Sequence, residues 1–276
     1  MSLTPLAGGF CFGEGPQWFE DLVWFSDMLG EAVHTATLGG QMSTLPLPGH
    51  APSGLGFCPD GALLIVSTQR RHILRYDGES VDLYADLSDV VPADLGDMVI
   101  DSRGTAYVGS QAREGGVIVR VDPGAARADG ISVVARDLDF PNGMALTPDG
   151  ATLIVAESVA RRLTSFTIDT DQKLTDRAVF ADGLAGPPDG ICLDADGGVW
   201  AAMTLAHEFA RITATGGVTD RIAIGQRAAI ACALGGPEGR TLFLVSAPGA
   251  YPDRLHGTSL GRLEATTVDV PAAALP

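Results

Sequence analysis

The amino-acid sequence predicts an all-β protein, a six-bladed β-propeller with four antiparallel strands per blade. Two observations support this prediction: an eight-residue pattern occurs six times, and strand-like runs follow each copy of it. The chain of 276 residues is long enough for a large core. Its 35 glycines and 17 prolines are typical of many short strands joined by turns.

The repeated octets set the number of blades. They begin at Gly15, Gly54, Asp97, Gly143, Gly190 and Cys232. Consecutive starts are therefore separated by 39, 43, 46, 47 and 42 residues. Four strands in a period of this length are typical of a propeller blade. A β-sandwich would not explain six units of similar length that share an octet, and a linear solenoid usually has shorter repeats.

Each octet is expected to form the innermost strand of its blade, along the central channel. Turns such as PDG, SRG and PEG favour a tight hairpin into a second strand, for example LLIVST or TLIVAES. Weaker third and fourth runs follow, such as HILRYDG and VDLYADL. The N-terminal LTPLAGGFCF is expected to supply the strand that closes the ring beside the last repeat. We therefore expect residues 1–276 to form a single propeller domain.

Composition narrows the class of partner. A formal net charge of −16 argues against a nucleic acid or an anionic membrane, which need basic patches. The four cysteines form no CxxC motif, so we expect small buried hydrophobes in a reducing compartment. No basic-then-apolar leader opens the chain and no apolar run approaches 18 residues, which favours a cytoplasmic protein. No oligomeric state is predicted, because ring closure leaves no edge that requires association.

Three hard oxygen donors occupy one position of the repeat. The residues that precede the six octets are Glu14, Ser53, Gly96, Asn142, Asp189 and Ala231. If the repeats surround an axis, Glu14, Asn142 and Asp189 converge at one mouth of the channel, while the three small residues leave space. Two carboxylates and an amide carbonyl suit Ca²⁺, Mg²⁺ or Mn²⁺. No histidine shares this phase, which disfavours a classical zinc site, and three protein ligands leave positions for water and substrate.

The segments FGEGPQW, FPNGMALTPDG and PPDGICLDADGGVWAA resemble the senescence marker protein/gluconolactonase/luciferin-regenerating enzyme family. The resemblance runs from about Phe12 to the C-terminal VDVP. It implies one divalent cation at the channel mouth, calcium in the first place, with manganese, magnesium, zinc or iron as alternatives. It also implies that Glu14, Asn142 and Asp189 are the metal ligands, that Asp189 is the general base, and that the activity is hydrolysis of sugar lactones or related esters.

Around the substrate the resemblance is partial. Glu114 matches a substrate-contacting Glu of the family, and Asp97 matches an Asp that lies behind the metal ligands. Gly96 stands where many members have an Asn that holds substrate or water, and the segment Ala93–Leu95 lacks an Arg that some members have. His207 follows the second strand of the fifth repeat and is a further candidate for the mouth. The candidate substrate-binding residues are Glu114, Asp97, Gly96 and His207.

The sequence therefore predicts a metal-dependent lactonase or esterase that acts on a small molecule. A non-catalytic propeller that binds a small ligand around a structural cation is one alternative. Hydrolysis of non-sugar esters or organophosphates is another, because an open metal site also polarises a P=O group. A Ser-His-Asp hydrolase is not expected, because no GxSxG elbow is present.

Overall fold

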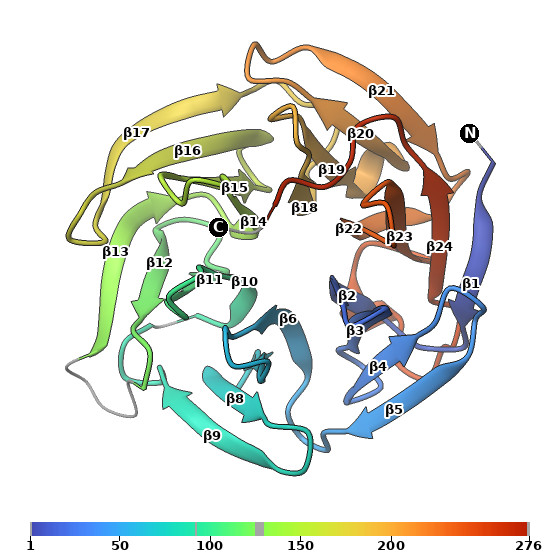
Figure 1. Ribbon diagram of the computed structural model, residues 1–276, viewed down its shortest axis with the longest axis horizontal. Helices are drawn as coiled ribbons and strands as arrows, with labels where there is room; N and C mark the ends of the chain where they lie inside the picture. Colours follow the sequence, from blue (N-terminus) through green and yellow to red (C-terminus); the bar gives the residue numbers. More distant parts are fainter. Residues whose placement is uncertain (1, 92, 125–129, 275–276) are drawn as a thin grey trace.

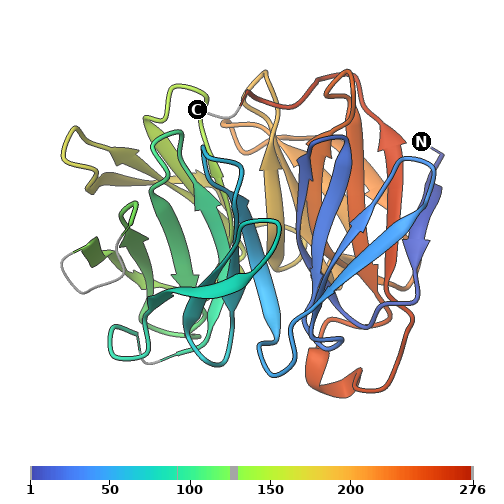
Figure 2. The ribbon, with the colours of Figure 1, turned by 60° about the horizontal axis from the view of Figure 1, so that its bottom comes forward.

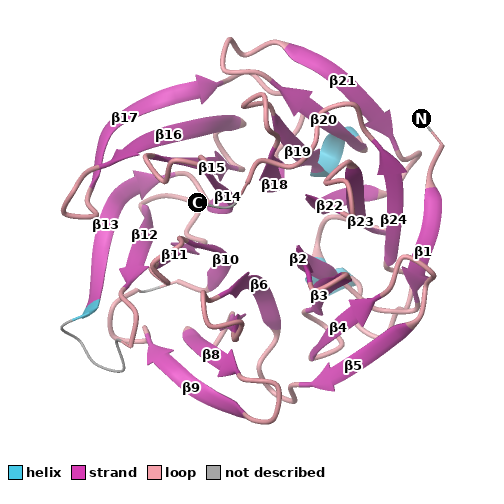
Figure 3. Ribbon diagram, in the orientation of Figure 1, coloured by secondary structure: helices cyan, strands magenta, loops and turns pink. Residues whose placement is uncertain are grey.

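Six antiparallel sheets of four strands each stand around a central axis in the computed structural model of the protein (Figure 1). The structure describes residues 2–91, 93–124 and 130–274. In these ranges, the helical elements longer than one residue are two short 3₁₀ turns, η2 (Thr204–Ala206) and η3 (Pro252–Arg254) (Figure 3). None of the helices in the described part of the chain is long and apolar enough to cross a membrane. The predicted all-β, six-bladed propeller is confirmed.

The first five blades are consecutive runs of four strands, counted from the axis outward. Blade 1 holds β2 (Gly13–Phe19), β3 (Leu22–Asp27), β4 (Ala32–Ala36) and β5 (Met42–Pro46). Blade 2 holds β6 (Pro52–Phe57), β7 (Leu63–Ser67), β8 (His72–Tyr76) and β9 (Val81–Asp86). Blade 3 holds β10 (Leu95–Ile100), β11 (Ala106–Ser110), β12 (Gly116–Val121) and β13 (Ile131–Leu138).

The remaining blades complete the ring. Blade 4 holds β14 (Pro141–Leu146), β15 (Thr152–Glu157), β16 (Arg162–Ile168) and β17 (Leu174–Ala181). Blade 5 holds β18 (Pro188–Leu193), β19 (Val199–Met203), β20 (Glu208–Ile212) and β21 (Val218–Ala223). Blade 6 holds β22 (Ala228–Gly235), β23 (Thr241–Ala247), β24 (Arg262–Thr267) and, outermost, β1 (Thr4–Gly8). Because β1 pairs antiparallel with β24, the predicted closure by the N-terminal segment is confirmed.

Every octet overlaps the innermost strand of its blade, as predicted, and these strands lie nearest the axis in Figure 1. The pairing of each inner strand with the second strand is irregular close to the residue that precedes the octet. The register shifts fall between Glu14/Gln17, Pro52/Leu55, Leu95/Met98, Pro141/Met144, Pro188/Ile191 and Ala229/Ala231. Such β-bulges re-aim side chains and are common beside active sites.

Glycine at the start of an octet lets neighbouring inner strands approach closely. A Cβ at Gly54 would lie 2.6 Å from Met98 N, and one at Gly143 would lie 2.6 Å from Ile191 N. Both contacts join the inner strand of one blade to that of the next. The residues that precede the octets are therefore neighbours around one ring.

We expect Gly143→Ala to lower the free energy of unfolding by about 1–3 kcal/mol, as overpacking does in a close-packed interior. The added methyl group would meet backbone atoms of β18, which cannot move without opening the inner ring. Gly39→Ala is the matched control, because its Cβ would lie 3.6 Å from the nearest atom, Thr37 Oγ1. Urea unfolding followed by tryptophan fluorescence compares the two, and equal midpoints would contradict the packing role of Gly143.

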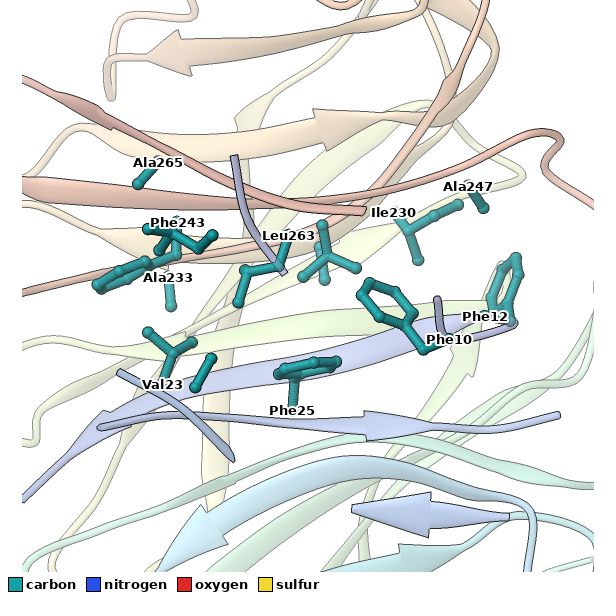
Figure 4. Close-up of a cluster of buried hydrophobic side chains, with 14 of the residues drawn as sticks. Phe10, Phe12, Val23, Phe25, Ile230, Ala233, Phe243, Ala247, Leu263 and Ala265 are labelled. Atoms are coloured by element: carbon teal, nitrogen blue, oxygen red, sulfur yellow. The ribbon is translucent and has the colours of Figure 1, made fainter. Parts of the chain in front are cut away.

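The hydrophobic core is divided among the blade interfaces. Six clusters of buried side chains are present in the described ranges, and each joins two adjacent blades. Figure 4 shows the cluster between blades 1 and 6, where Phe10 and Phe25 lie 4.9 Å apart between ring centroids. Burial of these faces between the sheets holds the blades in a ring and keeps the inner strands rigid.

All four cysteines are free, but only Cys232 is buried, whereas Cys11, Cys58 and Cys192 are partly exposed, so the expected burial holds for one of the four. Cys192 on β18 and Cys232 on β22 lie in adjacent inner strands, with their sulfur atoms 3.7 Å apart. Burial is the main reason why the pKa of Cys192 is raised well above its ordinary value. The Cys192 thiol is therefore protonated at neutral pH.

Candidate functional site

The three predicted metal ligands come together at the channel, as does Asp97. Glu14 on β2, Asp97 on β10, Asn142 on β14 and Asp189 on β18 are exposed by only 6%, 6%, 7% and 8%. Asn142 Nδ2 donates a hydrogen bond to Asp189 Oδ1. Each of these residues lies in or beside the bulge of its inner strand. The bulges thus gather four oxygen-bearing side chains from four blades.

Burial makes this group of side chains electrostatically costly. Burial raises the pKa of Glu14 well above its usual value, and the nearby Asp189 and Asp97 raise it further. Burial and Asp97 likewise raise the pKa of Asp189, although donation from Asn142 opposes them. Burial raises the pKa of Asp97 to about 6. Three carboxyl groups therefore share a site that is largely shielded from water.

The donor atoms fit a hard cation. Glu14 Oε2 and Asp97 Oδ1 are buried and accept no hydrogen bond from the described residues. Buried acceptors without a partner are rare in proteins, and a cation would supply the positive partner that these oxygens lack. No group of three or more His, Cys, Asp or Glu side chains within the described ranges is arranged to hold a metal ion. A centre here would thus depend on the Asn142 carbonyl as its third protein ligand.

The space expected beside Gly96 is not open, because the side chain of Gln111 fills it. A Cβ added at Gly96 would lie 2.6 Å from Gln111 Cδ and 2.8 Å from Cγ, closer than such atoms can approach. Gln111 Nε2 donates a hydrogen bond of 3.2 Å to Asn142 Oδ1. An amide is therefore present at the mouth, but it comes from the residue after β11 and not from β10. Reasoning from the octets alone missed Gln111 because it lies outside them.

Two serines also support the rim and were missed as parts of the site. Ser26 Oγ donates to Ser53 O at 2.6 Å and lies 3.1 Å from Glu14 O, which ties blade 1 to blade 2. Ser158 Oγ donates to Pro188 O at 2.6 Å and accepts from Asn142 Nδ2 at 3.4 Å. Both serines lie near the end of the second strand of a blade. An alignment of the second strands with one another could have indicated these positions.

The sequence-family model of the SMP-30/Gluconolactonase/LRE-like region matches residues 12–248 of the chain. The chain belongs to the SMP-30/gluconolactonase/LRE-like family. This agrees with the resemblance of the three motifs, which include Glu14, Asn142 and Asp189.

Named relatives of this family member include two lactonases. A 6-deoxy-6-sulfogluconolactonase of Pseudomonas putida is 28% identical, over 96% of this chain and 94% of its own. The pentonolactonase XacC of Haloferax volcanii is 26% identical, over 90% of this chain and 86% of its own. Among solved structures, regucalcin of Agrobacterium tumefaciens, described as a calcium-binding protein, has a TM-score of 0.77 and 23% identity. It covers 99% of both chains. At that identity the structural likeness supports the fold alone.

Glu114 and His207, the other two candidate substrate-binding residues, lie in connections between strands. Glu114 is exposed, in the connection from β11 to β12. His207 follows η2 in a left-handed conformation, and its Nδ1 lies 2.7 Å from Arg227 O. No hydrogen bond joins either side chain to Glu14, Asp97, Asn142 or Asp189 in the described part of the structure. Their contact with substrate stays a prediction.

Proposed function

We propose that this protein hydrolyses a small lactone at the channel mouth, with a divalent cation held by Glu14, Asn142 and Asp189. The observation that carries the proposal is the buried cluster of carboxyl and amide groups, two of whose oxygens have no described partner. Family membership and the two lactonase relatives support the class of reaction. Calcium is the first candidate, since all the proposed donors are hard oxygens.

When bound, the cation supplies a Lewis acid that polarises the lactone carbonyl and acidifies water. Glu14 and Asp189 bring the negative charge that holds it, and Asn142 adds a neutral oxygen. The hydrogen bond from Asn142 Nδ2 orients the Asp189 carboxylate by engaging Oδ1. Asp189 Oδ2 is therefore the oxygen left to take part in proton transfer.

In the proposed step, water attacks the carbonyl carbon while Asp189 accepts a proton from it. The bond from that carbon to the ring oxygen then breaks, and Asp189 returns the proton to the departing oxygen. The product is an open-chain hydroxy acid, so one water is consumed for each lactone. A positioned general base of this kind typically contributes about 10²- to 10⁴-fold to the rate.

The test is a panel of lactones, containing sugar-derived, aliphatic and aromatic rings, assayed after chelation and again after addition of Ca²⁺, Mn²⁺, Mg²⁺, Zn²⁺ or Fe²⁺. We expect hydrolysis of at least one ring with an added cation and none after chelation. The cation should also raise the melting temperature, since a ligand at 100 times its Kd stabilises by about 2.7 kcal/mol. Cation binding without turnover of any ring would instead favour a non-catalytic binding propeller. Turnover that persists after chelation would refute the metal mechanism.

A further inference from the structure

We propose that Gln111 is a positioning residue of the candidate metal centre, and that Gly96 is a glycine because it makes room for Gln111. The proposal rests on the metal site of the proposed function and names a residue that acts on it through Asn142. Gln111 is the first residue after β11, and its backbone N donates to Asp94 O at 2.7 Å. That bond fixes the start of its side chain beside the inner strand β10.

The conformation of Gly96 does not by itself require glycine. Gly96 is absent from the glycines with positive φ, so an L side chain suits its backbone. The three atoms nearest to a Cβ at this position all belong to the side chain of Gln111. This differs from Gly54 and Gly143, where the nearest atoms belong to the backbone of the next blade. The missing side chain at Gly96 is thus matched to one flexible neighbour.

The hydrogen bonds around Asn142 connect the position of Gln111 to the proposed metal ligand. Gln111 Nε2 is a donor and requires an oxygen of Asn142, whereas the Asp189 carboxylate is an acceptor and takes the Nδ2 group. The two neighbours together specify which way the Asn142 amide faces. An amide oxygen has two lone pairs, so Asn142 Oδ1 can accept from Gln111 and still bind a cation. Gln111 therefore fixes the only neutral ligand of the proposed three.

A double-mutant cycle tests the proposal, with the dissociation constant of Ca²⁺ measured by calorimetry in wild type, Gln111→Ala, Gly96→Ala and the double variant. We expect Gln111→Ala to weaken binding about tenfold or more, as loss of a partner of a metal ligand does. Gly96→Ala should weaken binding similarly in the wild-type background, because it displaces Gln111. In the Gln111→Ala background it should have no further effect. Gln111→Met should behave like Gln111→Ala, because it fills the space without a donor.

Melting temperatures and a matched control separate positioning from folding. Gln41→Ala, at an exposed residue before β5, should leave the Ca²⁺ affinity unchanged. Additive effects of the two substitutions, or an unchanged affinity in Gln111→Met, would overturn the inference while leaving the proposed function intact. If wild type binds none of the five cations, the metal centre and the inference fail together, and the lactone assay shows separately whether hydrolysis remains.

Discussion

Asp189→Asn should abolish lactone hydrolysis, with a loss of at least about 10²–10⁴-fold, the usual contribution of a general base. The amide keeps the shape of the side chain but removes both the proton acceptor and one negative charge from the proposed cation site. The same substitution should raise the melting temperature of the cation-free protein at pH 7. The reason is that Asp189 is 8% exposed and its pKa is raised by burial and by Asp97. Ionisation of such a group lowers the free energy of unfolding at every pH above its pKa in the unfolded chain.

A loss of hydrolysis together with a higher melting temperature distinguishes a functional residue from a structural one. Activity is measured at saturating cation, and melting is followed in chelator and then in added Ca²⁺. Asp82→Asn, on the exposed outer strand β9, is the matched control and should change neither property. Full activity in Asp189→Asn would refute the mechanism. A lower melting temperature in chelator would show that Asp189 stabilises the fold directly.

Glu157→Gln should destabilise the protein by about 3 kcal/mol at pH 7, since its buried carboxylate pairs with two partly exposed arginines. Glu157 ends β15 with a side chain that is 0% exposed. Burial alone would raise its pKa, but hydrogen bonds from Arg162, Thr164 and the Asp139 backbone outweigh burial and lower the pKa to about 2. Arg162 Nε and Nη2 each lie 2.8 Å from a carboxylate oxygen, and Arg177 Nη2 lies 3.1 Å away.

The lowered pKa fixes the pH range in which this stabilisation acts. It is fully present above the unfolded value, 4.5, and is lost as the pH falls toward about 2. Glu157→Gln should therefore be closest to wild type near pH 2 and differ most above pH 5. Urea unfolding at several pH values measures this, with Glu79→Gln in an exposed turn as the control. A constant difference between pH 2 and pH 7 would show that packing, and not charge, is what the substitution removes.

The blade count and the inner strands could be predicted because they repeat. Four of the six octets begin with a glycine that touches the next inner strand, as at Gly143, and the octets end in a turn. Residues at the same position of the repeat are far apart along the chain but lie close together around the axis. For that reason Glu14, Asn142 and Asp189, more than 40 residues apart in each step, could be expected to meet.

Contacts that do not repeat could not be predicted in the same way. Gln111 reaches the mouth from the end of a second strand, and no other blade has a glutamine in that role in the described residues. Ser158 likewise joins Asn142 to the backbone of the next blade through its hydroxyl group. Such contacts depend on the length and rotamer of one side chain. The general period of the sequence carries no information on either.

The bulges recur in all six inner strands, although only three blades carry a proposed ligand. Ser53 and Ala231 thus occupy the same kind of backbone position as Glu14 and Asp189. The scaffold separates the geometry of coordination from the identity of the ligands. Ligand number and charge at the axis can therefore change by single substitutions, with no strand rebuilt, and new chemistries can arise in this ring without a new fold.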